Sequence, residues 1–259
     1  MAEISSVSRL GRTEPFWLQI SRGQISWHRA VTVFGYNPDI DTSEELVWPD
    51  GATISSSETA VTLKISSNNA NDTSAGTGAR TVLITGLDGS HNEVSETVTL
   101  NGTTEVNSAN TYTHVNSMSI LTVGSGGSNA GHVYAGTGTV TLGVPANIFN
   151  LIETGFNQST TASYTIPAGY TGYMVNGGIS SGQAGGSNCV TGKLVIVDPN
   201  GVTRVAAVNA MNNGFSQYDF TLPLQIPAMY TVQARAVGSS TNNIVAANFQ
   251  ILLVKNDGN

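Results

Sequence analysis

Cysteine and charged residues are both scarce in this sequence. Its only cysteine, Cys189, excludes an intramolecular disulfide framework. Charged residues make up 10% of the chain, well below the roughly 25% of ordinary soluble domains. Surface polarity must therefore come from Ser, Thr, Asn and Gln, and stability must come from packing and association.

Long apolar runs are missing as well. No stretch approaches the ~20 apolar residues of a transmembrane helix, and the first residues lack the basic-then-apolar order of a secretory signal. We therefore expect no membrane partner. The 259 residues suffice for two small domains or one large β domain, each with a sizeable core.

The net charge of −7 is unevenly distributed. Residues 1–30 hold four arginines against two glutamates, a net charge of +2, so the remainder carries −9. A basic arm on an acidic body favours docking of the arm onto an acidic neighbour; the alternative is a set of solvated arginines. Nucleic-acid binding is disfavoured, because the body repels phosphate and no basic cluster lies among stacking aromatics.

Short segments rich in Val, Ile and Thr recur from residue 31 onward and are separated by turn pairs such as Asp88-Gly89 and Asn101-Gly102. Such regular spacing is typical of antiparallel β-sandwiches. The expected strands are 31–34, 60–65, 80–85, 95–100, 117–123, 137–142, 162–166, 172–180, 192–197, 203–209, 216–222, 230–236 and 245–254.

We therefore predict an all-β fold with an N-terminal extended arm and two antiparallel β-sandwich domains, the second jelly-roll-like. The arm spans residues 1–40, for docking or subunit exchange, and the first sandwich spans 41–148. The jelly-roll-like domain spans 149–259. Residues 144–150 change in composition and fit either a short helix or a linker.

Four segments carry a resemblance to known proteins: residues 34–42 with Val47-Trp48, residues 71–80, residues 96–104 and residues 124–131. Together they resemble a family of virion structural proteins of tailed bacteriophages. The resemblance covers roughly residues 30–142 and continues more loosely to the C-terminus. It implies a non-enzymatic place in the particle and brings no catalytic residues with it.

Aromatic residues and arginines gather in the predicted arm. Two tryptophans so close to a terminus are costly to leave in water, and Trp and Arg are the usual anchors of protein interfaces. We therefore predict a partner-binding surface on the arm and the segment after it. Its residues are Arg9, Arg12, Trp17, Arg22, Trp27, Arg29, Phe34, Tyr36, Asp39 and Asp41.

Metal, cofactor and catalytic sites are disfavoured. Asp39 and Asp41, with Glu44, Glu45 and Asp50, can offer oxygen ligands to Ca²⁺, but their spacing matches no calcium loop. Structural turns or an arm-docking contact are the favoured interpretation. No nucleophile elbow precedes a helical pattern, and no glycine-rich run continues into a phosphate cradle. The histidines follow no metal-ligand spacing; they are His28, His91, His114 and His132.

The glycine-rich segment 71–80 is expected to be a loop, held by Asn71, Asp72 and Ser74 through hydrogen bonds to nearby backbone. Cys189 fits either an exposed thiol or a small buried residue. Several tyrosines of the second domain either line a sugar-binding face, with loops 182–188 and 211–217, or pack on its core. They are Tyr164, Tyr170, Tyr173, Tyr218 and Tyr230.

Two functional hypotheses follow. The first is a non-enzymatic capsid decoration or cement protein on the exterior of a virion, made in the bacterial host cytoplasm. It binds the major capsid protein or other virion subunits through its arm, and it forms a homotrimer. The second is a tail or head fibre protein whose C-terminal domain binds host glycans. A neck or tail adaptor is a further alternative.

Overall fold

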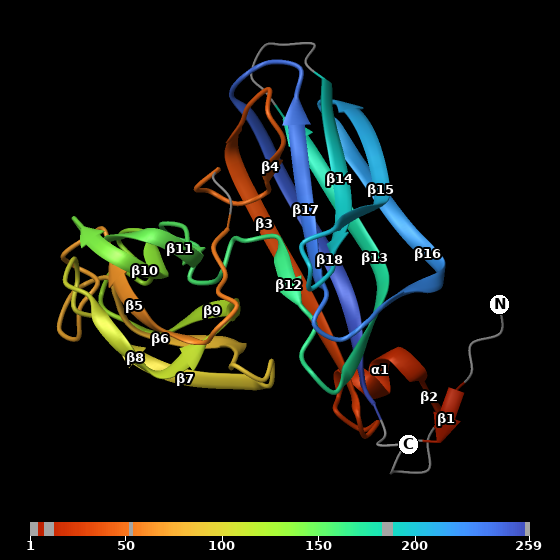
Figure 1. Cartoon of the computed structure of the whole chain (residues 1–259), viewed down its shortest axis with the longest axis horizontal. Coiled ribbons are helices and arrows are strands. Elements are labelled where there is room, and N and C mark those ends of the chain that lie inside the picture. The colour runs from red at the N-terminus through yellow and green to blue at the C-terminus, as the bar shows by residue number, and fades with distance from the viewer. Residues whose placement is uncertain (1–4, 8–12, 52–53, 183–188, 257–259) are drawn as a thin grey trace.

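A computed structural model describes residues 5–7, 13–51, 54–182 and 189–256 (Figure 1). Antiparallel strands in several sheets make up most of this part of the chain, so the prediction of an all-β protein is confirmed. Near the N-terminus, the short strands β1 (Ser5–Val7) and β2 (Thr13–Pro15) pair and lead into the six-residue helix α1 (Phe16–Ser21).

The C-terminal half and the two N-terminal strands β3 and β4 together form the main body, which has two sheets (Figure 1). The first sheet has the order β16-β13-β18-β3 and the second has β12-β17-β14-β15, with β4 also paired to β17. The strands are β3 (His28–Ile40), β4 (Glu45–Leu46), β12 (Ser163–Thr165), β13 (Tyr170–Gly182), β14 (Cys189–Val197), β15 (Thr203–Asn212), β16 (Gly214–Ile226), β17 (Thr231–Gly238) and β18 (Asn243–Lys255).

Alternating side chains bring the two sheets of the main body together. Along β18, every second residue from Val245 to Leu253 is buried, whereas Asn248 and Gln250 between them are exposed. Side chains of the other sheet, such as Leu194 and Val232, belong to the same hydrophobic cluster. The strand period of two therefore gives both sheets an apolar face, and these faces share one core.

Strands β5 to β11 form a second structure, which we call the inserted unit (Figure 1). It has one sheet of order β11-β10-β5-β8 and another of order β7-β6-β9, and side chains of both contribute to a separate hydrophobic cluster. Its strands are β5 (Val61–Ser67), β6 (Ala79–Leu87), β7 (Glu93–Thr99), β8 (Val106–Tyr112), β9 (His114–Val123), β10 (Val133–Thr141) and β11 (Val144–Ile152).

The chain leaves the main body for the inserted unit and returns from it at the same place, beside strand β17. Both β4 and β12 pair with β17, and Val47 and Ala162 fill the place between them. The Val47 N–H donates to the Ala234 carbonyl (2.9 Å), the Ala162 N–H donates to the Val47 carbonyl (3.1 Å), and the Ala234 N–H donates to the Ala162 carbonyl (3.0 Å). Residues 48–161 are thus an excursion from one split strand.

Gly35 of β3 permits this junction. A Cβ on Gly35 would collide with the Val47 carbonyl oxygen and the Ala162 Cβ, and would lie 2.6 Å from the Ala162 nitrogen. The next residue, Tyr36, donates its N–H to the carbonyl of Thr160 (3.0 Å). Only a residue without a side chain lets the β3 backbone approach both ends of the split strand so closely.

Beside the junction, a small apolar cluster fixes the inserted unit to the main body. Leu46 of β4 and the fully buried Trp48 pack with Tyr134, Ile148 and Leu151 of β10 and β11. Burying a side chain as large as that of Trp48 is among the largest single apolar contributions a residue makes. The inserted unit is therefore attached through packing as well as through its two chain connections.

Asp72 organises the loops at one end of the inserted unit. Its carboxylate is fully buried and accepts hydrogen bonds from the Ser67 hydroxyl (2.6 Å) and from the N–H groups of Ala79 (2.6 Å), Ala130 (2.8 Å) and Gly131 (2.9 Å). Its own carbonyl accepts the N–H of Gly102 (2.7 Å). Segments 71–80 and 124–131 therefore converge on one carboxylate, and segment 96–104 is bonded to the backbone of the same residue.

The arrangement of segments differs from the predicted one in two places. Residues 28–40 of the predicted arm form β3, which pairs with β18 along its length because its alternating apolar residues complete the main-body core. Residues 144–150 belong to strand β11, not to a helix or linker. Each predicted strand overlaps a strand of the structure. The expected loop is confirmed for residues 71–78, which Asp72 bonds to nearby backbone, whereas residues 79 and 80 already belong to β6.

We predict that Gly35→Ala lowers the free energy of unfolding by roughly 3 kcal/mol, because overpacking against backbone cannot be relieved by a side-chain rotation. Urea unfolding of the purified chain measures this change. The matched control is Gly89→Ala, whose Cβ would meet only the Ala60 Cβ at an ordinary 3.5 Å. Equal stability of the two variants would contradict the close approach at Gly35.

We predict that Asp72→Ala destabilises the inserted unit by about 3 kcal/mol or more, because it leaves three buried N–H groups and one hydroxyl without their acceptor. Asp39→Ala is the control, since Asp39 is exposed. Hydrogen exchange of the amides of Ala79, Ala130 and Gly131 reports the change directly. Undiminished protection of these amides in Asp72→Ala would show that the carboxylate does not hold them.

Candidate functional site

The predicted partner-binding residues lie in three separate places, and Arg9 and Arg12 lie outside the described residues. Trp17 lies in α1, and Trp27 lies in the turn just before β3. Helix α1 is at the end of the main body where β18 also ends (Figure 1). The side chains of Trp17 and Trp27 are 45% and 62% exposed. Phe16 packs edge-on against both Trp17 and His28. The distance between ring centroids is 5.8 Å for Phe16 and Trp17 and 6.0 Å for Phe16 and His28.

We call this region the aromatic end: residues 16–18 with Trp27 and His28. Leu18 is 45% exposed, and Trp27 has a left-handed backbone with φ of 66°. Such a φ is unusual for a bulky residue and marks a position under structural constraint. Because the Trp27 carbonyl accepts the N–H of Lys255 (2.9 Å), the backbone is held while the indole is exposed to solvent.

The arginines that follow are engaged within the chain. Arg22 forms an exposed ion pair with Glu14 (2.7 Å). Arg29 donates to both oxygens of Glu93 in β7 (2.8 and 3.0 Å), and its guanidinium lies 5.8 Å from the ring centroid of Tyr170. The hydrogen bond with Glu93 raises the pKa of Arg29. Arg29 therefore links the main body to the inserted unit.

Phe34 and Tyr36 also make internal contacts. Both rings stack on Phe156, with centroid distances of 6.2 and 5.7 Å. Phe156 lies on the segment that returns from β11 to β12 and is 38% exposed. These aromatics hold the returning chain against β3.

The acidic residues lie where β3 ends: Asp39 is still in the strand, and Asp41 begins the turn that leads to β4, so the turn is confirmed for the residues after Ile40. The Asp39 N–H donates to Asn37 Oδ1 (2.8 Å), and the Asp41 N–H donates to Glu45 Oε1 (3.1 Å). The Asp41 carbonyl accepts the N–H of Gly238 (2.7 Å). Within the described residues, no group of three or more His, Cys, Asp or Glu side chains is placed to hold a metal ion.

The tyrosines offered as a sugar-binding face mostly belong to the main-body core. Tyr164 is 5% exposed, and Tyr170, Tyr218 and Tyr230 are partly buried against the same cluster. The packing interpretation is thus confirmed for these four. Loop residues 183–188 lie outside the described residues, and Cys189 is a free, half-buried thiol.

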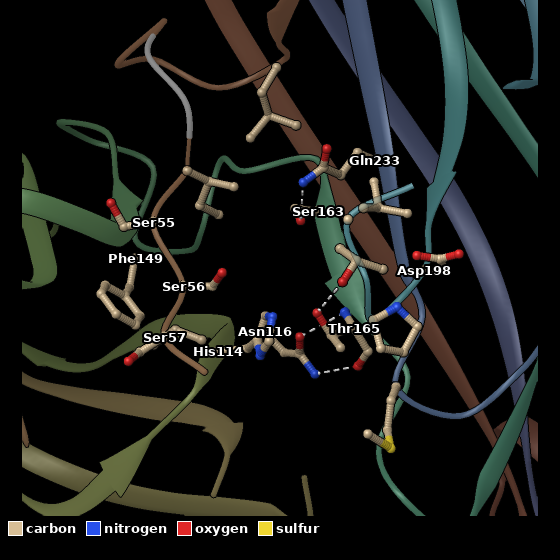
Figure 2. Close-up of a pocket in the computed structure, with 18 of the residues that line it drawn as sticks. Ser55, Ser56, Ser57, His114, Asn116, Phe149, Ser163, Thr165, Asp198 and Gln233 are labelled. Carbon is tan, nitrogen blue, oxygen red and sulfur yellow. Dashed lines mark hydrogen bonds between the residues drawn. The ribbon is translucent and has the colours of Figure 1, made fainter. Parts of the chain in front are cut away.

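Sequence reasoning missed a cleft between the main body and the inserted unit, with a volume of about 910 Å³ (Figure 2). One wall is the outer face of β12 and β17, and the other is formed by the segment before β5 together with parts of β9 and β11. In Figure 2 the Ser56 hydroxyl points into the gap, toward Ser163 and Thr165 on the opposite wall.

Hydrogen bonds hold the main-body wall in place. The Oε1 atom of Gln233 accepts from Nε (3.0 Å) and Nη2 (2.7 Å) of Arg235, and its amide donates to Ser163 Oγ (3.4 Å). Arg235 also donates to Glu44 (3.3 Å), which pairs with Lys193. The Lys193 hydrogen bond, followed by that of Arg235, lowers the pKa of Glu44 despite the opposing cost of burial.

At the floor of the cleft, Asn116 of β9 joins the two walls. Its amide donates to the Thr165 carbonyl (2.9 Å) and accepts the Thr165 N–H (2.9 Å), as Figure 2 shows. The side chain of Asn116 is 6% exposed. It satisfies backbone groups of the edge strand β12 that would otherwise be open to pairing with another chain.

His114 lies beside Asn116 in the same floor. Its Nδ1 is buried and has no hydrogen-bond partner among the described residues, and its ring centroid lies 5.8 Å from that of His91. Burial, reinforced by the nearby charge of His91, lowers the pKa of His114 to about 4. Scattered histidines gave no sequence signal for this pairing, because β9 and the turn before β7 meet only through the fold.

Comparisons with known proteins give little information. No protein-family model matches the sequence, and no curated protein matches it. Among solved structures, the chain is similar to VP2 in a subviral particle of infectious bursal disease virus, with 10% identity, a TM-score of 0.24, and coverage of 89% of this chain and 73% of that one.

It is also similar to a structure of the Gx strain of that virus, with 11% identity, a TM-score of 0.26, and coverage of 90% of this chain and 73% of that one. Scores this low carry no argument about function. No helix in the described part of the chain has the length and apolar character needed to cross a membrane.

We predict that acid destabilises the protein partly through His114. The ordinary histidine pKa of 6.5 applies to the unfolded chain, whereas the folded pKa is about 4, so below pH 6.5 protons bind preferentially to the unfolded state. Stability contributed at this position is therefore lost as pH falls from 6.5 to 4. His114→Gln should flatten that part of the pH dependence of the unfolding free energy, measured by urea unfolding across this pH range.

Proposed function

We propose that the chain is a non-enzymatic structural subunit of a viral particle, which attaches to other virion subunits through its aromatic end. The observation that carries this proposal is the exposure of Trp17 and Trp27, at 45% and 62%. Tryptophans are the side chains most enriched at energetically important interface positions, and exposing two of them on a monomer is unfavourable.

The strand order of the main body supports the proposal by analogy. We propose that this body is a jelly roll and that the inserted unit is a second β-sandwich. Reading β3, the split strand β4/β12 and β13 to β18 as strands B to I gives sheets of order B-I-D-G and C-H-E-F. Jelly rolls occur in viral capsid and lectin domains, although a fold alone does not determine function.

The direction of attachment follows from the same geometry. The aromatic end and the C-terminal end of β18 lie at one end of the main body, whereas the inserted unit lies along its side (Figure 1). Attachment through the aromatic end leaves the inserted unit free to project or to cover neighbours. We propose the major capsid protein as the attachment partner, so that the chain acts as a decoration or cement subunit on the virion exterior.

Self-association as a homotrimer is part of the proposal. Strands β15 and β16 are the last strands of their sheets, and both carry large exposed apolar side chains. Edge strands of this kind are common sites of chain–chain contact. The exposed residues are Val205 (55%), Val208 (53%), Phe215 (65%) and Leu222 (84%).

We predict that the double variant Trp17→Ala, Trp27→Asn reduces binding to phage heads assembled without this chain by about 30-fold or more, the effect of truncating a single interface hot spot. Asn is chosen because it tolerates the left-handed backbone of Trp27. Cosedimentation with the heads measures the binding.

Leu121→Ala is the matched control, because Leu121 is an exposed apolar residue on β9 of the inserted unit, away from the aromatic end and from the edge strands β15 and β16. Native mass spectrometry checks that each variant keeps the mass of the wild-type assembly, which the proposal sets at three chains. Head binding that survives the double variant, with the mass unchanged, would refute attachment through the aromatic end.

A further inference from the structure

The cleft between the main body and the inserted unit plays no part in the proposed attachment, yet it has the features of a built binding site. Its volume of about 910 Å³ lies within the range of small-molecule sites, and it opens between two separately folded structures. Such positions between folded units are common places for ligand binding. The chemistry of its walls therefore indicates what it can bind.

Charge on the walls excludes one large class of ligand. Four carboxylates line the cleft, those of Glu44, Glu45, Glu58 and Asp198, against the single guanidinium of Arg235. Arg235 is already engaged by Gln233 and Glu44. Glu44 also pairs with Lys193, and Asp198 pairs with Arg204. Glu45 and Glu58 are therefore the lining carboxylates that form no ion pair among the described residues. Phosphate, sulfate and carboxylate ligands would meet an excess of negative charge in a partly enclosed space, so anionic ligands are disfavoured.

Neutral hydrogen-bonding groups make up most of the remaining lining. They come from both walls. On the main-body wall some already bond within the wall, Gln233 to Ser163 and Arg235, and Thr231 to Thr165. Ser56 on the opposite wall and Asn200 are exposed. Hydroxyls and amides donate and accept at the same time, which suits a ligand that carries many hydroxyl groups of its own. These groups belong to Ser55, Ser56, Ser163, Thr231, Asn200 and Gln233.

Apolar contacts are present at restricted points. Met229 and Pro199 lie on the main-body side. Phe149 lies on the inserted-unit wall, as Figure 2 shows, but it is only 2% exposed and belongs to the core of the inserted unit. Met229 is 37% exposed and has a left-handed backbone, with φ of 68°. A few apolar surfaces among many hydroxyl and amide groups match the two kinds of surface on a sugar ring, its C–H face and its hydroxyl rim.

Three sets of contacts between the main body and the inserted unit fix the position of the two walls. The Asn116–Thr165 hydrogen bonds close the floor of the cleft, the Arg29–Glu93 ion pair links the two structures, and the cluster around Trp48 fixes their junction. A ligand therefore enters a preformed site and does not have to order it, which favours affinity.

We propose that this cleft binds a neutral oligosaccharide. The site is distinct from the tyrosine face that the sequence offered, because most of those tyrosines belong to the main-body core. The proposal rests on the cleft alone and does not require the aromatic end or any particle partner. Sugar rings lie between the β12–β17 wall and the segment around Ser56, with their hydroxyls paired to the walls.

The test uses the full-length chain and saturation-transfer NMR with defined neutral hexasaccharides: maltohexaose, cellohexaose, laminarihexaose and mannohexaose. A galacturonic acid hexamer serves as the anionic probe. We expect at least one neutral probe to bind more tightly than the anionic one. Failure of all four neutral probes to bind at millimolar concentration would overturn the proposal, as would equal binding of the anionic probe.

Two substitutions then locate the site, one on each wall. Ser56→Trp and Asn200→Trp place a large side chain in the cleft at exposed positions, so each is expected to fold and to weaken binding at least about tenfold. Ser125→Trp, at an exposed serine of a distant loop, is the matched control. Urea unfolding verifies that each variant is folded.

Binding that persists in the folded cleft variants would place the sugar elsewhere and overturn the proposal. Cosedimentation of the same cleft variants with phage heads tests whether sugar binding and head binding use different surfaces. If sugar binding is lost and head binding is kept, the two surfaces act independently. Loss of sugar binding in Ser125→Trp as well would also overturn the assignment to the cleft.

Discussion

The close approach of Gly35 to the split strand is the constraint on which the rest of the structure depends. Because β3 has no side chain at this point, its backbone lies against both Val47 and Ala162, where the chain leaves and re-enters the main body. The connections to the inserted unit therefore lie side by side at one point of β17. A domain inserted at adjacent chain ends can be accommodated without opening the core of its host.

Strand β3 relates this junction to the other features of the molecule. At its start it leads from the aromatic end, and there Arg29 reaches across to Glu93 of the inserted unit. Its middle supports the junction, and its far end forms the turn that contains Asp41. A single strand thus connects the proposed attachment surface with the cleft.

Much of the fold could be predicted from sequence, since alternating Val, Ile and Thr mark strands such as β6 and β18 through their burial period. The pairing of β3 with β18 could not be predicted, because it joins opposite ends of the chain and no local pattern specifies a partner. The split strand was equally hidden, since β4 has two residues and β12 three. The cleft forms only once the split strand has placed the inserted unit beside β17. Its lining residues therefore come from distant parts of the sequence and form no motif.

The scarcity of charge and the polar cleft have a common physical origin. In this chain, side-chain amides make many of the buried polar contacts. Asn116 donates to the carbonyl of Thr165 on the edge strand β12, and Asn129 and Asn150 donate to buried backbone carbonyls. Each satisfies backbone groups without the cost of burying a charge. The same residue types on an open wall offer neutral donors and acceptors. A surface of that kind cannot attract ions strongly, but it can match a neutral, hydroxyl-rich ligand group by group.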